Sequence, residues 1–160
     1  MIIIRKKVPG LSEGALNRFS ARALAAAGVV GKVDVLITNN RELRALNRRF
    51  RDRDAVTDVL SFPSEAGSLN ELAGDIAISA EMAALNARTL GHSAGDEIKI
   101  LILHGMLHLA GYDHERDHGV MARKEAQLRR AFKLPVALIE RHSLRRQARG
   151  KGLNKPGTAR

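Results

Sequence analysis

The sequence contains no cysteine among its 160 residues. Disulfide scaffolds, thiolate metal sites and cysteine nucleophiles are therefore excluded. Aromatic residues are scarce as well, with no tryptophan, one tyrosine and four phenylalanines. So few rings argue against a protein that reads single-stranded nucleic acid by stacking its bases.

The sequence also lacks an apolar run of membrane-spanning length. Its most apolar stretch, residues 98–111, is interrupted by Lys99 and by two histidines, well short of the roughly 20 residues that a transmembrane helix needs. The N-terminal residues, MIIIRKKVPG, place apolar residues before charges, which is unlike a signal peptide. We therefore expect a cytoplasmic protein with no membrane partner.

Positive charge is in excess, and it is concentrated near the C-terminal end. The formal net charge is +10, and residues 143–160 contain six Lys or Arg and no acidic residue, which leaves an excess of four positive charges elsewhere. This segment is rich in glycine and charge and has no apolar period, so we expect a basic, disordered tail. It is either a solvated tail of no specific role or a nonspecific nucleic-acid arm. Residues 1–142 suffice for one compact domain.

Strand and helix patterns alternate through this domain. Short apolar stretches predict strands at 2–4, 33–37, 57–62 and 74–79, and apolar periodicity predicts helices at about 12–28, 39–50, 79–90 and 96–110. Residues 63–74 are rich in turn formers and predict a mobile loop. The expected fold class is α/β (α+β), with a single small mixed β-sheet packed by helices.

The helix predicted at 39–50 has two distinct faces. Leu43, Leu46 and Phe50 recur at the spacing of an apolar face. The opposite face is basic, because four arginines recur at nearly the same helical angle: Arg41, Arg44, Arg48 and Arg51. Such a row is often only a solvated surface, but it also suits the binding of phosphodiesters.

Three of the six histidines lie within the eleven residues HGMLHLAGYDH. His104 and His108 are four residues apart on a helix without a polar face, so both are expected inside the protein, one turn above the other. Gly111 can end this helix in the left-handed conformation and return the chain. His114 can then reach the same ion, which gives three nitrogen ligands and one open tetrahedral position.

The remaining histidines have weaker claims to a metal. His118 is four residues after His114 and could compete as a ligand, but a surface position is the more economical interpretation. His92 and His142 have no evident partners in the sequence. A carboxylate that fixes the tautomer of a ligand histidine is expected, and the candidates, which the sequence does not rank, are Asp58, Asp75 and Asp113.

The spacing HxxxHxxGxxH is also that of the metzincin metalloproteases. Those enzymes have a glutamate directly after the first histidine as general base, whereas this chain has Gly105. Glu115 or Asp113 would have to replace it, and nothing in the spacing shows that either reaches the water. A metal site beside a basic helix and a basic tail favours nucleic acid over peptide.

Three segments, in order along the chain, resemble the YbeY family of bacterial endoribonucleases: LNRRFRDRDAVTDVLSFP (46–63), GDIAIS (74–79) and HGMLHLAGYDH (104–114). Most of residues 1–140 can be aligned around them, while the extension beyond about residue 140 is not part of the family's core pattern. The implied fold is a small mixed sheet with helices around it and a metal in a cleft beside it.

The resemblance implies a zinc-dependent hydrolase that cleaves single-stranded RNA. Its implied role is maturation of the 3′ end of precursor 16S rRNA and ribosome quality control, with the small ribosomal subunit as partner. One zinc ion per chain would be held by His104, His108 and His114. Arg51 corresponds to the family's functional arginine, so Arg51 and His114 are the expected catalytic residues, and the general base is unassigned.

Two other functions are compatible with the residues. A zinc-dependent peptidase would cleave peptides in a His104-dependent manner. A nonenzymatic ribosome assembly factor would use zinc only to hold its fold.

RNA bound mainly through its backbone, with Arg41, Arg44 and Arg48 as further contacts, should dissociate as salt rises.

Overall fold

The computed structural model describes residues 1–65 and 71–135. The predicted tail at 143–160, His142 and part of the predicted loop at 63–74 lie outside the described residues. Four strands form one mixed sheet: β1 (Ile2–Ile4), β2 (Lys32–Thr38), β3 (Val59–Pro63) and β4 (Leu72–Ser79). The order is β1-β2-β4-β3, with β1, β2 and β4 parallel and β3 antiparallel to β4. This arrangement leaves β3 as an edge strand.

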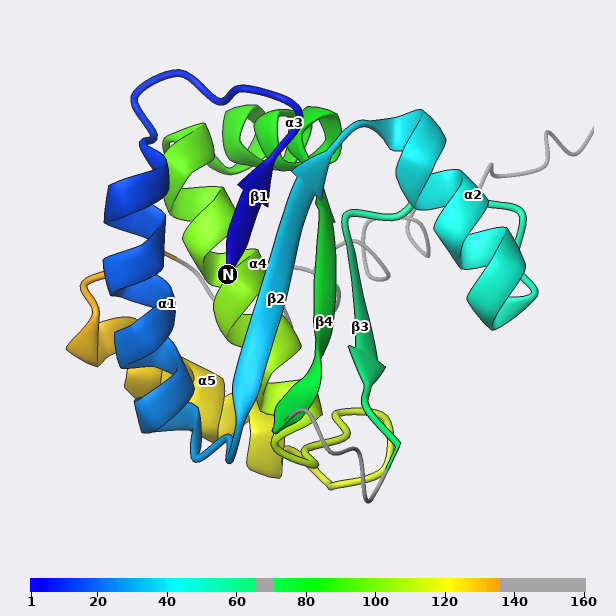
Figure 1. Ribbon diagram of the computed structural model, residues 1–160. Coiled ribbons are helices and arrows are strands. Elements are labelled where there is room, and N and C mark those ends of the chain that lie inside the picture. The colour runs from blue at the N-terminus through cyan, green and yellow to red at the C-terminus, as the bar shows by residue number, and fades with distance from the viewer. Residues whose placement is uncertain (66–70, 136–160) are drawn as a thin grey trace, which may run out of the picture.

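Five helices occur in the described part of the chain: α1 (Glu13–Ala27), α2 (Asn40–Arg51), α3 (Ala80–Leu90), α4 (Ala94–Leu109) and α5 (Val120–Ala131). α4 runs behind the sheet, with α1, α3 and α5 around it, and α2 stands apart beside β3 and β4 (Figure 1). The predicted fold class is therefore confirmed. None of these helices combines the length and apolarity that a membrane span requires.

The main core lies between α4 and the sheet. One face of β2 and β4 packs against the helices. Its side chains, which are almost completely buried, are those of Val35, Ile37, Ile76 and Ile78. Every residue of α4 from Glu97 to Leu107 except the partly exposed Lys99 is buried, as the absence of a polar face predicts. Leu43, Leu60 and Ala77 form a second, smaller cluster, through which α2 packs on the opposite face of the sheet.

Capping residues fix the helix boundaries. Ser79 accepts a hydrogen bond from the backbone N–H of Met82, and Ser93 accepts one from Asp96. α4 therefore begins at Ala94, slightly before the predicted residue 96. Ser12 and Gly28 bound α1 as predicted.

The helices differ from the sequence-based expectations in two respects. Phe50 does not share the buried face of Leu43, because it lies at the end of α2, where its ring contacts Phe62 and the guanidinium of Arg49 and stays 55% exposed. The sequence analysis also did not predict α5. Only three of its residues are buried, and one of these, Glu125, is charged, so the apolar stripe is too weak to identify the helix.

Candidate active site

A cleft of about 780 Å³ opens where the edge strand β3 meets the end of α4. One wall is formed by the chain from Thr57 to Ser61, and another by the turn from Gly111 to Glu115. The end of α2 contributes Arg51 at its rim. The three histidines of the sequence motif all line this cleft, as Pro63, Asn47 and Arg53 also do.

His104 and His108 are held by partners on their Nδ1 atoms. The Nδ1 of His104 lies 2.9 Å from Glu125 Oε2, and the Nδ1 of His108 lies 3.0 Å from the backbone oxygen of Tyr112. Both partners are acceptors, so each ring carries its proton on Nδ1 and directs an unprotonated Nε2 forward. These two Nε2 atoms are 3.1 Å apart.

His114 completes the group after a tight turn. Gly111 has a φ of +97°, and the N–H of Tyr112 donates to Leu107 O at 3.0 Å, so the chain reverses directly after α4. The ring centroid of His114 then lies 5.4 Å from that of His104 and 5.1 Å from that of His108. One ligand atom from each histidine lies within 4.8 Å of the others, which is compatible with a shared ion.

The electrostatics of this cluster favour a cation. Two Nε2 lone pairs facing each other repel unless a positive charge lies between them. Burial and the neighbouring His104 and His114 lower the pKa of His108 to about 4, so its ring is neutral and free to ligate near pH 7. His114 Nδ1 is buried and has no hydrogen-bond partner among the described residues. The donor set therefore fits a metal ion, and its three imidazoles are typical of zinc.

The carboxylate that orients the ring of His104 is Glu125, which was not among the candidates from the sequence. Glu125 is 1% exposed and reaches His104 from α5. The three candidates from the sequence do not take this position. Asp58 binds Asn86, Asp75 lies exposed on β4, and Asp113 accepts from the N–H of Glu115. The sequence signal that could have identified Glu125 is its spacing, because it lies between Met121 and Leu128 on the same buried face of the helix.

Arg51 is the only one of the four arginines of α2 named above that lines the cleft. Its Nη2 donates a hydrogen bond to the backbone oxygen of Ser61, and its guanidinium carbon lies 5.7 Å from the Phe62 ring centroid. The side chain is thereby fixed against β3, while its other N–H groups remain for a ligand.

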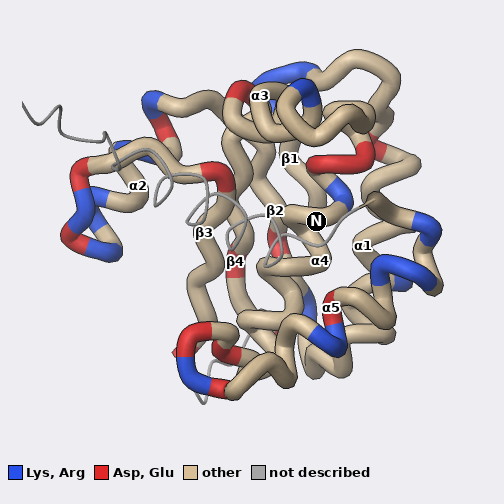
Figure 2. Tube along the Cα trace, turned by 180° about the vertical axis from the view of Figure 1, so that it is seen from behind, with Lys and Arg blue, Asp and Glu red and all other residues tan. Residues whose placement is uncertain are grey.

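The other three arginines lie outside the cleft. Arg41 and Arg48 are exposed, and Arg44 forms a two-point ion pair with Asp54, at 2.7 Å and 3.0 Å. This ion pair lowers the pKa of Asp54 and raises that of Arg44. Figure 2 shows acidic residues interspersed with basic ones on and around α2, so the predicted arginine row is not a continuous basic surface.

Arg53 lines the cleft too, although the sequence analysis did not single it out. Asp52 adopts a left-handed conformation, with φ of +53°, and the N–H of Arg53 donates to Asn47 O at 3.3 Å. The buried side chain of Asn47 then donates to Ala55 O at 3.0 Å. This turn chemistry, which apolar periodicity does not detect, brings a second arginine to the cleft.

Gly105 leaves no room for a side chain. A Cβ at this position would lie 2.9 Å from Ile76 Cδ1 and 3.0 Å from Ser61 Oγ. The residue after His104 therefore packs against the sheet, and the side chains of Ile76 and Ser61 would have to shift to admit the glutamate that a metzincin has there.

The remaining described histidines differ in environment. His118 is exposed, as expected, with a φ of +53°. His92, which has no evident partner in the sequence, has one in the structure: its Nε2 lies 2.6 Å from the buried carboxylate of Glu97. The two residues are five positions apart across a helix boundary, so no simple period links them.

Comparison with known proteins agrees with this arrangement. The family described as Endoribonuclease YbeY matches residues 4–133. The chain is 57% identical to Endoribonuclease YbeY of Koribacter versatilis over 141 residues, covering 88% of this chain and 91% of the relative. It is 46% identical to the Solibacter usitatus protein of that name over 140 residues, covering 88% and 92%, and 43% identical to one from Helicobacter pylori over 141 residues, covering 88% and 97%.

A solution structure from Thermotoga maritima has a similar fold. Its TM-score is 0.54 at 24% identity, and the match covers 99% of this chain and 100% of that one. The family match includes all three cleft histidines and Arg51. The chain therefore belongs to the YbeY family of endoribonucleases.

Proposed function

We propose that this protein is a zinc-dependent endoribonuclease that hydrolyses single-stranded RNA in the cleft beside β3. Its substrate in the cell is precursor 16S rRNA, which it trims at the 3′ end in contact with the small ribosomal subunit. The observation that carries the proposal is the 3.1 Å approach of two Nε2 atoms whose rings are each held by an acceptor on Nδ1, in a cleft that Arg51 also lines.

His104, His108 and His114 would hold one zinc ion. Three imidazoles leave one position of a tetrahedral site open, as in other catalytic zinc sites. When bound, zinc supplies Lewis acidity, which polarises a water or a phosphoryl oxygen. Glu125 keeps the His104 ring in the tautomer that presents Nε2, and the carbonyl of Tyr112 does the same for His108.

Arg51 would stabilise the negative charge that develops on the phosphoryl oxygens. Its hydrogen bond to Ser61 O holds the guanidinium in advance, so little reorganisation accompanies the reaction. Arg53, on the same cleft, would bind a neighbouring phosphate. Arg41 and Arg48 would contact RNA beyond the cleft, and Arg44 would contribute least because Asp54 already pairs with it.

The peptidase alternative is weakened by the packing at Gly105, where the general base of a metzincin would stand. Glu115 and Asp113 line the cleft and are the remaining carboxylates of that alternative. A nonenzymatic assembly factor would retain the metal but would not need Arg51 on the cleft. Cleavage assays distinguish the three functions.

The test is cleavage of precursor 16S rRNA, and of an unrelated single-stranded RNA, by purified wild-type protein and by His114→Ala and Arg51→Ala. Arg18→Ala, on the exposed face of α1 and away from the cleft, is the matched control. We expect the first two variants to lose at least about a hundredfold in rate while remaining folded, since each removes a charge-stabilising element. Arg18→Ala should cut like wild type. Equal cleavage by all four preparations would indicate a contaminating nuclease, and a casein-cutting protein that leaves RNA intact would favour the peptidase.

A further inference from the structure

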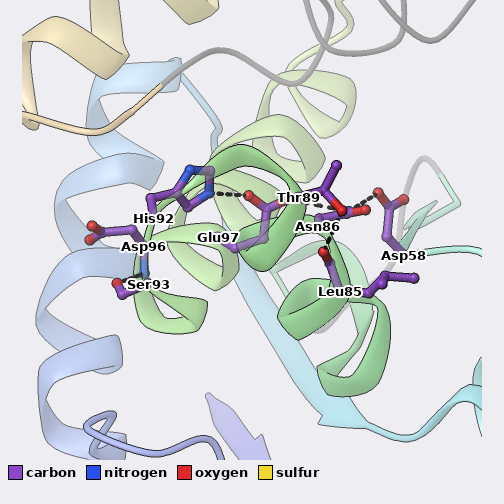
Figure 3. Close-up of polar contacts among 8 residues, drawn as sticks. All are labelled: Asp58, Leu85, Asn86, Thr89, His92, Ser93, Asp96 and Glu97. Atoms are coloured by element: carbon purple, nitrogen blue, oxygen red, sulfur yellow. Dashed lines mark hydrogen bonds and ion pairs between the residues drawn. The ribbon is translucent and has the colours of Figure 1, made fainter.

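A buried chain of polar side chains runs from the helices to the cleft wall (Figure 3). His92 Nε2 lies 2.6 Å from Glu97 Oε2, and Asn86 Nδ2 lies 3.3 Å from Glu97 Oε1. The same Nδ2 lies 3.0 Å from Asp58 Oδ2. Glu97 and Asn86 are at most 1% exposed, and Asp58 is 9% exposed. Only the Asp58 end of this chain lines the cleft.

Asn86 fixes the Asp58 carboxylate in one orientation. An amide nitrogen has two hydrogens, and here one is directed to each of two carboxylates. Rotating the amide would place its oxygen against them, so a single orientation is stable. The backbone of Asp58 is held as well, because its carbonyl accepts from Ser79 N at 2.9 Å. The side chain is therefore organised before any ligand enters.

Asp58 lines the cleft, and one of its two carboxylate oxygens lacks a partner among the described residues. Oδ2 accepts from Asn86, whereas Oδ1 makes no hydrogen bond to any residue in 1–65 or 71–135. A fixed carboxylate repels a polyanion, so its presence in a cleft that binds RNA is unfavourable unless it meets a hydrogen-bond donor. RNA carries such a donor on every sugar, the 2′-hydroxyl, which DNA lacks.

The position of Asp58, directly before β3, favours a sugar over a base as the partner. Asp58 lies three residues before Ser61, which binds Arg51, a separation of roughly 10 Å on an extended strand. A strand held by one phosphate at Arg51 thus brings a sugar within one or two nucleotides to Asp58. Among the residues that line the cleft, Tyr112 is the only aromatic one, so base stacking has little support there.

We propose that Asp58 Oδ1 accepts a hydrogen bond from a ribose 2′-hydroxyl and thereby selects RNA over DNA. Asn86, Glu97 and His92 are positioning residues that hold this carboxylate. The inference rests on the proposed function, since it takes RNA as the ligand of the cleft. It adds a specificity residue that neither the metal site nor Arg51 supplies, because phosphate contacts do not distinguish the two nucleic acids.

The test compares three short oligonucleotides of one sequence: RNA, DNA and 2′-fluoro RNA. The fluorine keeps an RNA-like sugar but donates no hydrogen bond. Binding of each to full-length, zinc-loaded protein is followed by fluorescence anisotropy in the cold, before cleavage. We expect wild type to bind RNA about tenfold more tightly than either of the others, the effect of one charge-assisted hydrogen bond. Equal affinity for RNA and 2′-fluoro RNA would overturn the inference without any variant.

Asp58→Ala is the matching variant, because it leaves neither a donor nor an acceptor toward the cleft, whereas the N–H₂ of an asparagine could still donate to the oxygen of the 2′-hydroxyl. It should bind the three oligonucleotides equally. Asp96→Asn makes the same charge change where Figure 3 shows the carboxylate directed away from the chain, so it should keep the preference. A merely structural role for Asp58 would weaken RNA and DNA binding alike and leave their ratio unchanged, which contradicts the proposal.

The cleavage assay separates this inference from the proposed function. A protein that cuts RNA while Asp58→Ala keeps the tenfold preference refutes only the role of Asp58. A protein that prefers RNA through Asp58 but cuts none refutes only the nuclease. Thermal unfolding of each variant shows whether it is folded.

Discussion

At the scale of single residues, the site depends on which nitrogen of each imidazole carries a proton. Glu125 and the carbonyl of Tyr112 decide this for His104 and His108, because each accepts from Nδ1. The nitrogens available to a metal are thus selected by residues other than the three histidines. Glu125 is the more informative of the two, since it arrives from a separate helix and is buried.

Replacement of Glu125 by glutamine tests this selection. The amide can still accept from His104 Nδ1, but it no longer raises the basicity of the ring, so zinc affinity should fall about tenfold to a hundredfold. The measurement is competition with a chromophoric zinc chelator. Glu13→Gln, at an exposed position at the start of α1, serves as the control and should bind zinc normally. An unchanged affinity in Glu125→Gln would mean that the carboxylate contributes packing alone.

At the scale of secondary-structure elements, β2 and β4 place two carboxylates side by side. Asp34 and Asp75 are paired in the parallel register, and Asp34 also binds the N-terminal amine of Met1 at 2.8 Å. Partial burial, and then the proximity of Asp34, raise the pKa of Asp75. Repulsion between the ionised carboxylates of Asp34 and Asp75 on the outer face of the sheet therefore lowers the stability of the fold.

Asp75→Asn should stabilise the fold near neutral pH. A carboxyl whose pKa is higher in the folded state than in the unfolded state costs stability once it is ionised, above its folded pKa, and costs nothing below its unfolded pKa. The gain should be below about 1 kcal/mol, because solvent screens so exposed a pair, and it should shrink as the pH falls toward 4. Urea unfolding at both pH values measures it. A gain that grows on acidification would refute this account.

The strongly patterned elements could be predicted from the sequence, and those defined by tertiary contacts could not. α4 has an unbroken apolar run, and α1, α3 and α4 begin at serine caps, so their positions were recognisable. α5 has three buried residues on a basic helix, which gives too weak a period. The same limit hid Glu125 within α5 and the pairing of His92 with Glu97, since both depend on how helices pack.

The site shows the same division. The spacing of His104, His108 and His114 around Gly111 was sufficient to bring them together, because helix geometry and one glycine turn determine it. The arginine row on α2 was less informative. Helical angle alone does not reveal that Asp54 pairs with Arg44 or that Ser61 anchors Arg51. Of the four arginines in the row, Arg51 alone lines the cleft.

At the scale of the whole molecule, the cleft joins parts of the chain that are distant in sequence. The end of α2, the edge strand β3 and the turn after α4 meet there, and α5 supports His104 from behind. The buried chain from His92 to Asp58 adds α3 to the same assembly. Three histidines that could hold a metal ion, an arginine and a carboxylate thus converge on one surface, which suits the proposed action on RNA.

The central claim is that RNA cleavage depends on one zinc ion held by the three histidines. The most direct measurement treats the protein with a chelator, removes the chelator, and follows cleavage of a labelled single-stranded RNA as zinc is added back. The account predicts that activity is absent at first, rises in proportion to zinc, and reaches a plateau at one ion per chain, while His114→Ala regains none. Full activity in the metal-free protein, or its recovery in His114→Ala, would contradict it.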